Sequence, residues 1–173
     1  RSESAKLLMM ISNESTDAEG DAPRVLPGVL AQFAGAGIVG AVFGAALAWA
    51  LVGDMAGALV GMGIYAAVMG IAVFGVRAGF PHRAIGLCNV ATIARLALVS
   101  VLIAALVAPD APPRSVFIVA VFAFALDGLD GWLARREGRA SAFGARFDME
   151  VDSILALVLA LLALVVLISL PVM

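Results

Sequence analysis

Four aspartates lie close together in a chain that is otherwise strongly apolar, and carboxylates at these spacings can hold metal ions. The segment ALDGLDGWLARREGRASAFGARFDMEVDS (residues 125–153) contains Asp127, Asp130, Asp148 and Asp152. Aspartates three or four residues apart share one face of a helix. The connection between the pairs is short enough for two antiparallel neighbouring helices, the second starting before Asp148, so the pairs are expected to meet at one depth. Carboxylates brought together in this way repel each other, and most would take up protons unless a cation lies between them. Oxygen ligands with no histidine or cysteine nearby favour hard cations such as Mg²⁺, Mn²⁺ or Ca²⁺.

The stretch between the two aspartate pairs carries groups that suit a phosphate substrate. Carboxylate-bound Mg²⁺ commonly also holds substrate phosphates, and arginine can bind phosphate through two hydrogen bonds. The arginines are Arg135, Arg136, Arg139 and Arg146, and glycines stand at Gly128, Gly131 and Gly144. A positively charged loop with a few capping aspartates would also explain the arginines. It does not explain Asp127, which directly follows the apolar run FAFAL.

The elements that position these residues are predicted to be membrane-spanning helices. Hydrophobic residues make up 63% of the 173 positions and charged residues 14%, with a mean hydropathy of +1.08. The apolar residues are clustered in runs long enough for helices that cross a bilayer, which takes roughly 20 residues. We therefore predict an all-α, polytopic transmembrane helical bundle. Its five predicted spans are Gly28–Val52, Met55–Val76, Gly86–Val107, Ser115–Leu133 and Val151–Leu170.

The chain divides into three predicted parts. Residues 1–27 read as a flexible acidic tail, and residues 28–80 as two glycine-rich spans. The pairs Gly40/Gly44 and Gly57/Gly61 have the small-xxx-small spacing that lets helix backbones approach closely. Residues 81–173 carry the polar residues and the aspartates.

The basic residues predict the orientation of the bundle. Alternating the five spans places nine basic residues on one side of the membrane and only Arg114 on the other. The nine are Arg1, Lys6, Arg24, Arg77, Arg83, Arg135, Arg136, Arg139 and Arg146. Because cytoplasmic loops carry the excess of Lys and Arg, the aspartates are expected at the cytoplasmic side.

Arg95 falls inside the third predicted span, in the sequence CNVATIAR. A charge at membrane depth costs at least about 2.5 kcal/mol unless it finds a partner or water. One interpretation is that the side chain extends to the nearby interface. The other is that Arg95 faces an anionic group inside the bundle.

The aspartate segment resembles the signature of the CDP-alcohol phosphatidyltransferase family. The pattern D-x2-D-G-x2-A-R-x8-G-x3-D-x3-D is filled at every position and every spacing. Its residues here are Asp127, Asp130, Gly131, Ala134, Arg135, Gly144, Asp148 and Asp152. CNVATIAR is also similar to the weaker Pro-Asn-x-x-Thr-x-x-Arg pattern of that family, with Cys88 in place of proline.

The resemblance implies a role for each matching residue. Asp127, Asp130 and Asp148 would bind divalent cations, two ions of Mg²⁺ or Mn²⁺, and Asp152 would be the base and a further metal ligand. The nucleotide would be bound by Gly131, Ala134, Arg135 and Gly144. Substrate phosphate would be contacted by Arg95, Arg139 and Ser141.

The resemblance also implies the reaction and its partners. Members transfer a phosphoalcohol group from a CDP-linked donor to a hydroxyl acceptor and release CMP, within phospholipid biosynthesis. We expect CDP-diacylglycerol as donor, contact with membrane lipids, a homodimer, and no nucleic acid. The expected location is the bacterial inner (cell) membrane. The acceptor stays open between glycerol phosphate, inositol phosphate, serine and choline.

The resemblance covers about Gly86–Leu170, so the chain would hold the first three helices of a family core of six, after two extra N-terminal spans. Because three core helices are missing and the chain begins at Arg1, we expect a fragment. Two alternatives belong to other classes of protein. An ion- or proton-coupled transporter would use the aspartates as a relay, although such carboxylates normally lie near the bilayer midplane. A non-catalytic membrane scaffold would leave the spacing of the aspartates unexplained.

Overall fold

Five helices form a bundle in the computed structural model, which describes residues 27–80, 84–108, 110–137 and 141–169. The predicted tail lies outside the described residues. The helices are α2 (Pro27–Leu51), α3 (Met55–Gly79), α4 (Leu87–Val107), α5 (Pro113–Glu137) and α6 (Ala142–Ser169). The described part of the chain contains no strand, so the all-α prediction is confirmed.

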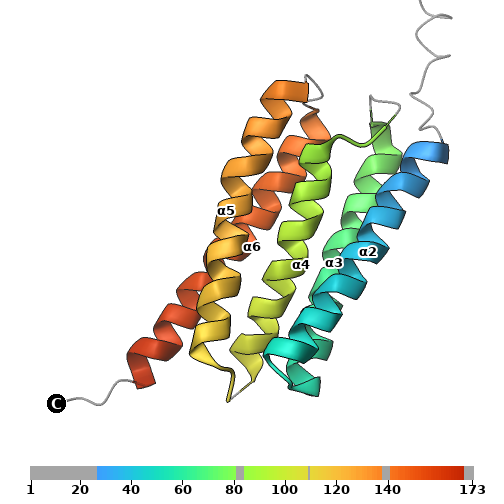
Figure 1. The fold of residues 1–173 in the computed structure, drawn as a ribbon. Coiled ribbons are helices and arrows are strands. Elements are labelled where there is room, and N and C mark those ends of the chain that lie inside the picture. The colour runs from blue at the N-terminus through green and yellow to red at the C-terminus, as the bar shows by residue number, and fades with distance from the viewer. Residues whose placement is uncertain (1–26, 81–83, 109, 138–140, 170–173) are drawn as a thin grey trace, which may run out of the picture.

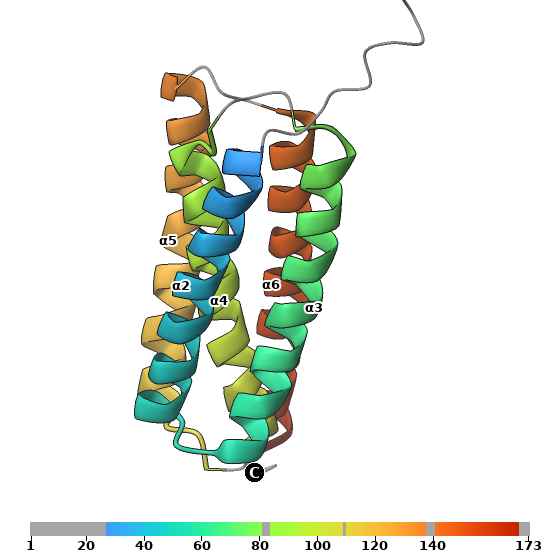
Figure 2. The same ribbon diagram turned by 90° about the vertical axis from the view of Figure 1, so that its right-hand side faces the viewer.

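Helix α4 lies at the centre of the bundle, and the other four helices surround it (Figures 1 and 2). Its most extensive partner is α5, followed by α3, α2 and α6, whereas α5 and α6 touch each other only over a short stretch. As a result α4 is buried along most of its length, including its four polar residues Asn89, Thr92, Arg95 and Ser100.

The helix ends fall at two opposite ends of the bundle. The end that we call the site end holds the starts of α2, α4 and α6 and the last residues of α3 and α5 (Figure 1). Arg77 and Arg146 lie on helix segments at the site end, and Arg114 lies at the opposite end. These three arginines therefore lie at the ends of the bundle where the sequence predicts them, Arg77 and Arg146 at one end and Arg114 at the other.

Four of the helices are long and apolar enough to cross a membrane. Within the described residues these are Gly28–Leu51, Met55–Ala78, Leu87–Val107 and Ala142–Ser169. The fourth predicted span is present as α5, which has 25 residues, but Asp127 and Asp130 interrupt its apolar sequence. The chain is thus an integral membrane protein with four candidate spans, and a fifth membrane crossing by α5 remains a prediction.

Helix α6 differs most from its predicted bounds. The prediction placed the start of the apolar span at Val151 and the start of the helix before Asp148, and the helix begins at Ala142. Hydropathy identifies only the apolar part, because the first turns carry Arg146, Asp148 and Glu150. The start of the helix is instead signalled by Ser141, whose Oγ accepts a hydrogen bond from the Gly144 amide at 3.0 Å, as a helix-capping serine does.

Glycines on α2 and α3 set the distance of these helices from α4. A Cβ on Gly44 would lie 3.2 Å from the Ala97 carbonyl oxygen, and one on Gly57 or Gly61 would overlap the backbone of α4. The structure therefore confirms the packing role predicted for these glycines. The turn between α2 and α3 uses Gly53 at φ +71° and Asp54, whose carboxylate accepts a 2.6 Å hydrogen bond from the Gly57 amide.

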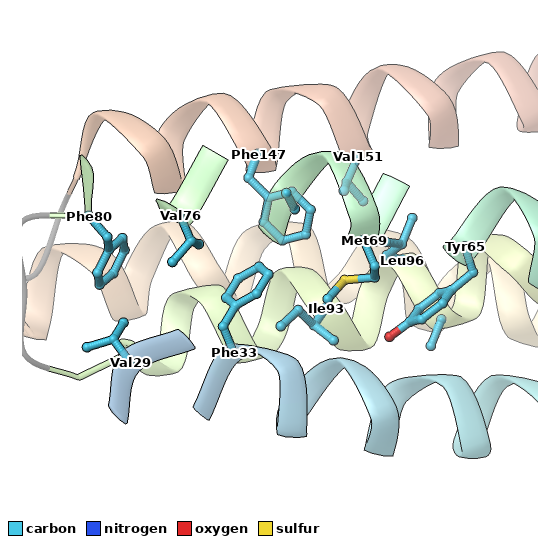
Figure 3. Packing of buried hydrophobic residues seen from close by; sticks show 12 residues of the cluster. Val29, Phe33, Tyr65, Met69, Val76, Phe80, Ile93, Leu96, Phe147 and Val151 are labelled. Atoms are coloured by element: carbon cyan, nitrogen blue, oxygen red, sulfur yellow. The ribbon is translucent and has the colours of Figure 1, made fainter. Parts of the chain in front are cut away.

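Aromatic side chains join α2 to α6 near the site end (Figure 3). The Phe33 ring lies edge-on to Phe147 (Figure 3). It also lies edge-on to Phe143, with 5.8 Å between the ring centroids in both pairs. Deeper in the same cluster, the Tyr65 hydroxyl donates a 2.7 Å hydrogen bond to the Gly37 carbonyl. This cluster fixes α2, α3 and α6 around the first half of α4, where Arg95 lies.

Candidate active site

The candidate site is built around the side chain of Arg95. It lies on α4, two turns from the start of the helix, and none of its surface is exposed. The interpretation that Arg95 extends to the interface is therefore wrong. The alternative, that it faces anionic groups inside the bundle, is confirmed by its ion pairs with Asp127, Asp148 and Asp152.

The three aspartates reach the guanidinium from two different helices. Asp127 lies on α5, and its Oδ1 is 2.5 Å from Arg95 Nη1. Asp152 lies on α6 and accepts a hydrogen bond from the same nitrogen, while Asp148, one turn earlier, accepts one from Nη2. The antiparallel arrangement of α5 and α6 thus brings these carboxylates to one depth, as the sequence predicts.

The described part of the site contains more acidic than basic side chains. Among the side chains that the structure describes, three carboxylates face a single guanidinium. The Arg95 side chain is fully buried, whereas those of Asp127, Asp148 and Asp152 are 42%, 35% and 39% exposed. The carboxylates therefore form the accessible side of the site, where a cation from solution can reach them.

The residues present are of the type that binds a divalent cation. Asp127 and Asp152 both bond one nitrogen of Arg95, so their oxygens lie within hydrogen-bond reach of a single positively charged point. In the described residues, however, no three ligand-type side chains are arranged around one ion position, because the guanidinium lies between the carboxylates. The donor set fits Mg²⁺ or Mn²⁺, and binding would require Arg95 to release some of these contacts.

A second group of polar residues lies where the first turns of α4 and α6 meet. Asn89 is 2% exposed, and its side-chain Nδ2 has no hydrogen-bond partner among the described residues. Its Oδ1 would be 3.0 Å from a Cβ placed on Gly144, and Ser141 Oγ would be 3.1 Å from it. A buried amide without a partner is costly. Asn89 is therefore poised to donate a hydrogen bond to a ligand.

Several predicted site residues cannot be located in this detail. Asp130, Gly131, Ala134 and Arg135 follow Asp127 on α5, but their side chains lie outside the described residues. Arg139 lies outside them altogether. Ser141 and Gly144 are described, and the hydroxyl of Ser141 serves as the cap of α6.

Reasoning from the sequence missed two features of this site. It did not identify these aspartates as the anionic groups that Arg95 faces, although Arg95 of α4 pairs with aspartates of both α5 and α6. It also gave no role to Asn89, although the buried position of this amide is signalled by its spacing of three and six residues from Thr92 and Arg95 on one side of the helix.

Comparison with protein-family models decides the identity of this site. Residues 85–173 match the model described as CDP-alcohol phosphatidyltransferase, which is half of the chain. The chain belongs to the CDP-alcohol phosphatidyltransferase family. The match includes α4, α5 and α6, and with them every aspartate of the site, while α2 and α3 precede it.

This membership makes the protein a CDP-alcohol phosphatidyltransferase family enzyme of phospholipid synthesis, in which a CDP-alcohol donor and an acceptor are the substrates. The family is typically metal-dependent, which agrees with the donor set of the site. Membership favours the enzyme over the transporter and scaffold alternatives. No curated protein and no solved structure matches the chain.

Proposed function

We propose that this enzyme transfers a phosphatidyl group from CDP-diacylglycerol to a hydroxyl acceptor and releases CMP. The observation that supports the proposal most strongly is the meeting of Asp127, Asp148 and Asp152 at the fully buried Arg95, inside the segment that matches the family. Such a group of acidic side chains beside a buried cation suits a substrate that carries phosphates and metal ions together.

In the proposed reaction, the acceptor oxygen attacks the donor phosphorus that is bonded to CMP. A new phosphorus–oxygen bond forms, the bond to CMP breaks, and CMP departs with the bonding electrons. Asp152 takes the proton of the acceptor hydroxyl as general base. It is 39% exposed beside Asp127 and Asp148, so an acceptor can reach it from the open side of the site.

Two divalent cations, Mg²⁺ or Mn²⁺, would be held by Asp127, Asp130, Asp148 and Asp152. When bound, they supply positive charge that neutralises the pyrophosphate of the donor and the departing phosphate. Arg95, whose two terminal nitrogens contact Asp127, Asp148 and Asp152, would then be able to bind substrate phosphate as well. Arg139 and Ser141 are the further candidates for phosphate contact.

The nucleotide would lie against Gly131, Ala134, Arg135 and Gly144. Support for Gly144 comes from its surroundings, because a Cβ there would occupy the space beside the Asn89 side-chain oxygen Oδ1, at 3.0 Å. Arg135 would orient the nucleotide by charge-assisted hydrogen bonds.

The remaining proposals concern the setting of the enzyme. We place the site end at the cytoplasmic side of a bacterial inner membrane, because basic residues favour that side. We count α5 as a fifth span because it packs along α4, which is itself a candidate span. A homodimer is proposed from the family resemblance alone.

The experiment that tests this function uses full-length protein in liposomes. CDP-diacylglycerol, Mg²⁺ and a panel of acceptors (glycerol phosphate, inositol phosphate, serine and choline) are supplied, and CMP and the lipid product are measured. We expect CMP release with one acceptor, and a decrease of about 10²–10⁴-fold in Asp152→Asn. The matched control is Asp110→Asn, an exposed aspartate between α4 and α5 at the opposite end. Near-normal turnover in Asp152→Asn would remove the base role, and absence of CMP release in the wild type would refute the donor.

A further inference from the structure

An apolar groove runs along the outside of the bundle between α2 and α5, with α4 as its floor. It has a volume of about 420 Å³, and every residue that lines it is apolar. Phe43 of α2 is 49% exposed, and Ile118 and Phe122 of α5 are 43% and 63% exposed. The groove is therefore open along its side to the lipid that surrounds the helices.

One end of the groove meets the candidate active site. Its lining includes Leu126 and Ala94, which directly precede Asp127 and Arg95 in the chain. Asp127 and Arg95 form an ion pair, so these two lining residues flank the point where α5 and α4 meet in the site. A molecule with its phosphate at the aspartates can therefore place an attached chain directly into this groove.

The groove extends along the helices over part of the length of an acyl chain. From Leu126 to Ile118 is eight residues of helix, or about 12 Å at 1.5 Å per residue. A chain that begins beside Asp127 would thus lie in contact with protein over about this length, directed toward the opposite end of the bundle, where α2 ends at Leu51.

A second cavity of similar size is less suited to an acyl chain, because charged side chains form part of its lining. It lies between α3 and α6, has a volume of about 400 Å³, and is lined in part by Arg146 and Glu150. Phe147, which directly precedes Asp148, also lines this cavity, so the charged lining and not the distance from the site distinguishes it from the groove.

We infer that the groove between α2 and α5 binds an acyl chain of the lipid-linked CDP donor, and that α2 thereby helps to select the donor. This inference rests on the proposed function. Helix α2 contributes Phe43, Leu47 and Leu51 to the groove, although it precedes the residues that match the family. Chain selection would therefore depend on a helix outside the family segment.

The test compares donors of two chain lengths in liposomes with full-length enzyme. Ile118→Trp adds bulk at the end of the groove that lies farther from the site. We expect it to raise the KM for CDP-diacylglycerol with sixteen-carbon chains by about threefold or more, since a long chain loses its packing against the helices. The KM for the donor with eight-carbon chains should remain unchanged, which also shows that the variant folds.

Two further variants separate the groove from the general lipid surface. Val121→Trp adds similar bulk at an exposed position of α5 outside the groove, and should leave both KM values unchanged. Phe43→Ala removes a ring from the α2 wall and should raise the KM for the long-chain donor, whereas Phe74→Ala on α3, 75% exposed and outside the groove, should not.

The outcomes distinguish this inference from the proposed function. If the wild type consumes CDP-diacylglycerol but Ile118→Trp changes both donors equally, or if Val121→Trp has the same effect, the groove holds bulk lipid and the inference is wrong. If diacylglycerol with CDP-choline is consumed instead, the groove serves the acceptor and the assignment to the donor is wrong. If the wild type consumes no CDP-linked lipid, the proposed function and this inference fail together.

Discussion

Replacing Arg95 with glutamine should make the stability of this protein depend strongly on divalent ions. The guanidinium is fully buried and pairs with Asp127, Asp148 and Asp152. Removing one partner of a buried ion pair costs about 3–5 kcal/mol. Because the three carboxylates are 35–42% exposed, water screens part of their repulsion, and we expect the low end of that range, about 3 kcal/mol.

Mg²⁺ should restore most of this stability, because it can replace the positive charge that Arg95→Gln removes. An ion present at 100 times its dissociation constant stabilises the folded state by about 2.7 kcal/mol. In the wild type the gain should be smaller, since Arg95 must first release its carboxylates. The two proteins should therefore differ most in EDTA and least at high Mg²⁺.

Thermal unfolding in detergent measures this effect, with a thiol-reactive dye that reports exposure of Cys88, the single cysteine. Arg114→Gln, an exposed arginine at the opposite end of the bundle, is the control and should change stability by less than about 0.5 kcal/mol. Equal melting of Arg95→Gln and wild type in EDTA would refute the reasoning, as would an equal gain from Mg²⁺ in both proteins.

Three further changes have definite expected results. Gly61→Ala should destabilise the protein by about 1–3 kcal/mol, because its Cβ would overlap the Ser100 carbonyl oxygen. Gly63→Ala has open space around its Cβ and should be nearly neutral. Equal melting temperatures of the two variants would contradict this expectation. Gly144→Ala should raise the KM for the CDP donor by about tenfold without changing the melting temperature, because the Asn89 side chain must move to make room for the Cβ. Equal KM values in Gly144→Ala and the wild type would argue against a nucleotide site at Gly144. EDTA should abolish CMP release and added Mg²⁺ or Mn²⁺ should restore it, so turnover that persists in EDTA would contradict the proposed ion requirement.

Much of the architecture is predictable from the sequence because the bilayer leaves few choices. Long apolar runs must become helices there, and the predicted bounds of α2 and α4 agree with the structure to within one residue at each end. The bounds of α5 and α6 are less accurate, because hydropathy responds to apolar composition and both helices extend into polar sequence. The spacing of Asp148 and Asp152 predicts a helix that starts before Asp148, and the capping serine, Ser141, marks its start more closely.

The candidate site is predictable in its residues and only partly in its geometry. Helical spacing placed Asp148 and Asp152 on one face, and the short connection placed Asp127 at the same depth. Neither signal shows which side chain lies between the two helices, because that depends on how α4 is rotated. Since α5 and α6 contact each other only over a short stretch, the space between the aspartates is filled from α4, by Arg95.

The rotation of α4 is in turn fixed by the two helices that precede the family segment. Glycines of α2 and α3 press against Ala97, Ser100 and Ala104, which follow Ile93 at intervals of four, seven and eleven residues on one side of α4. At 100° per residue, Arg95 is turned about 200° from Ile93, so it points to the opposite side of the helix, toward α5 and α6. Close packing on one side of α4 therefore holds the Arg95 guanidinium among the aspartates on the opposite side of the helix. Substitutions at the contacts of α2 and α3 with α4 should consequently disturb the site, although these residues do not touch it.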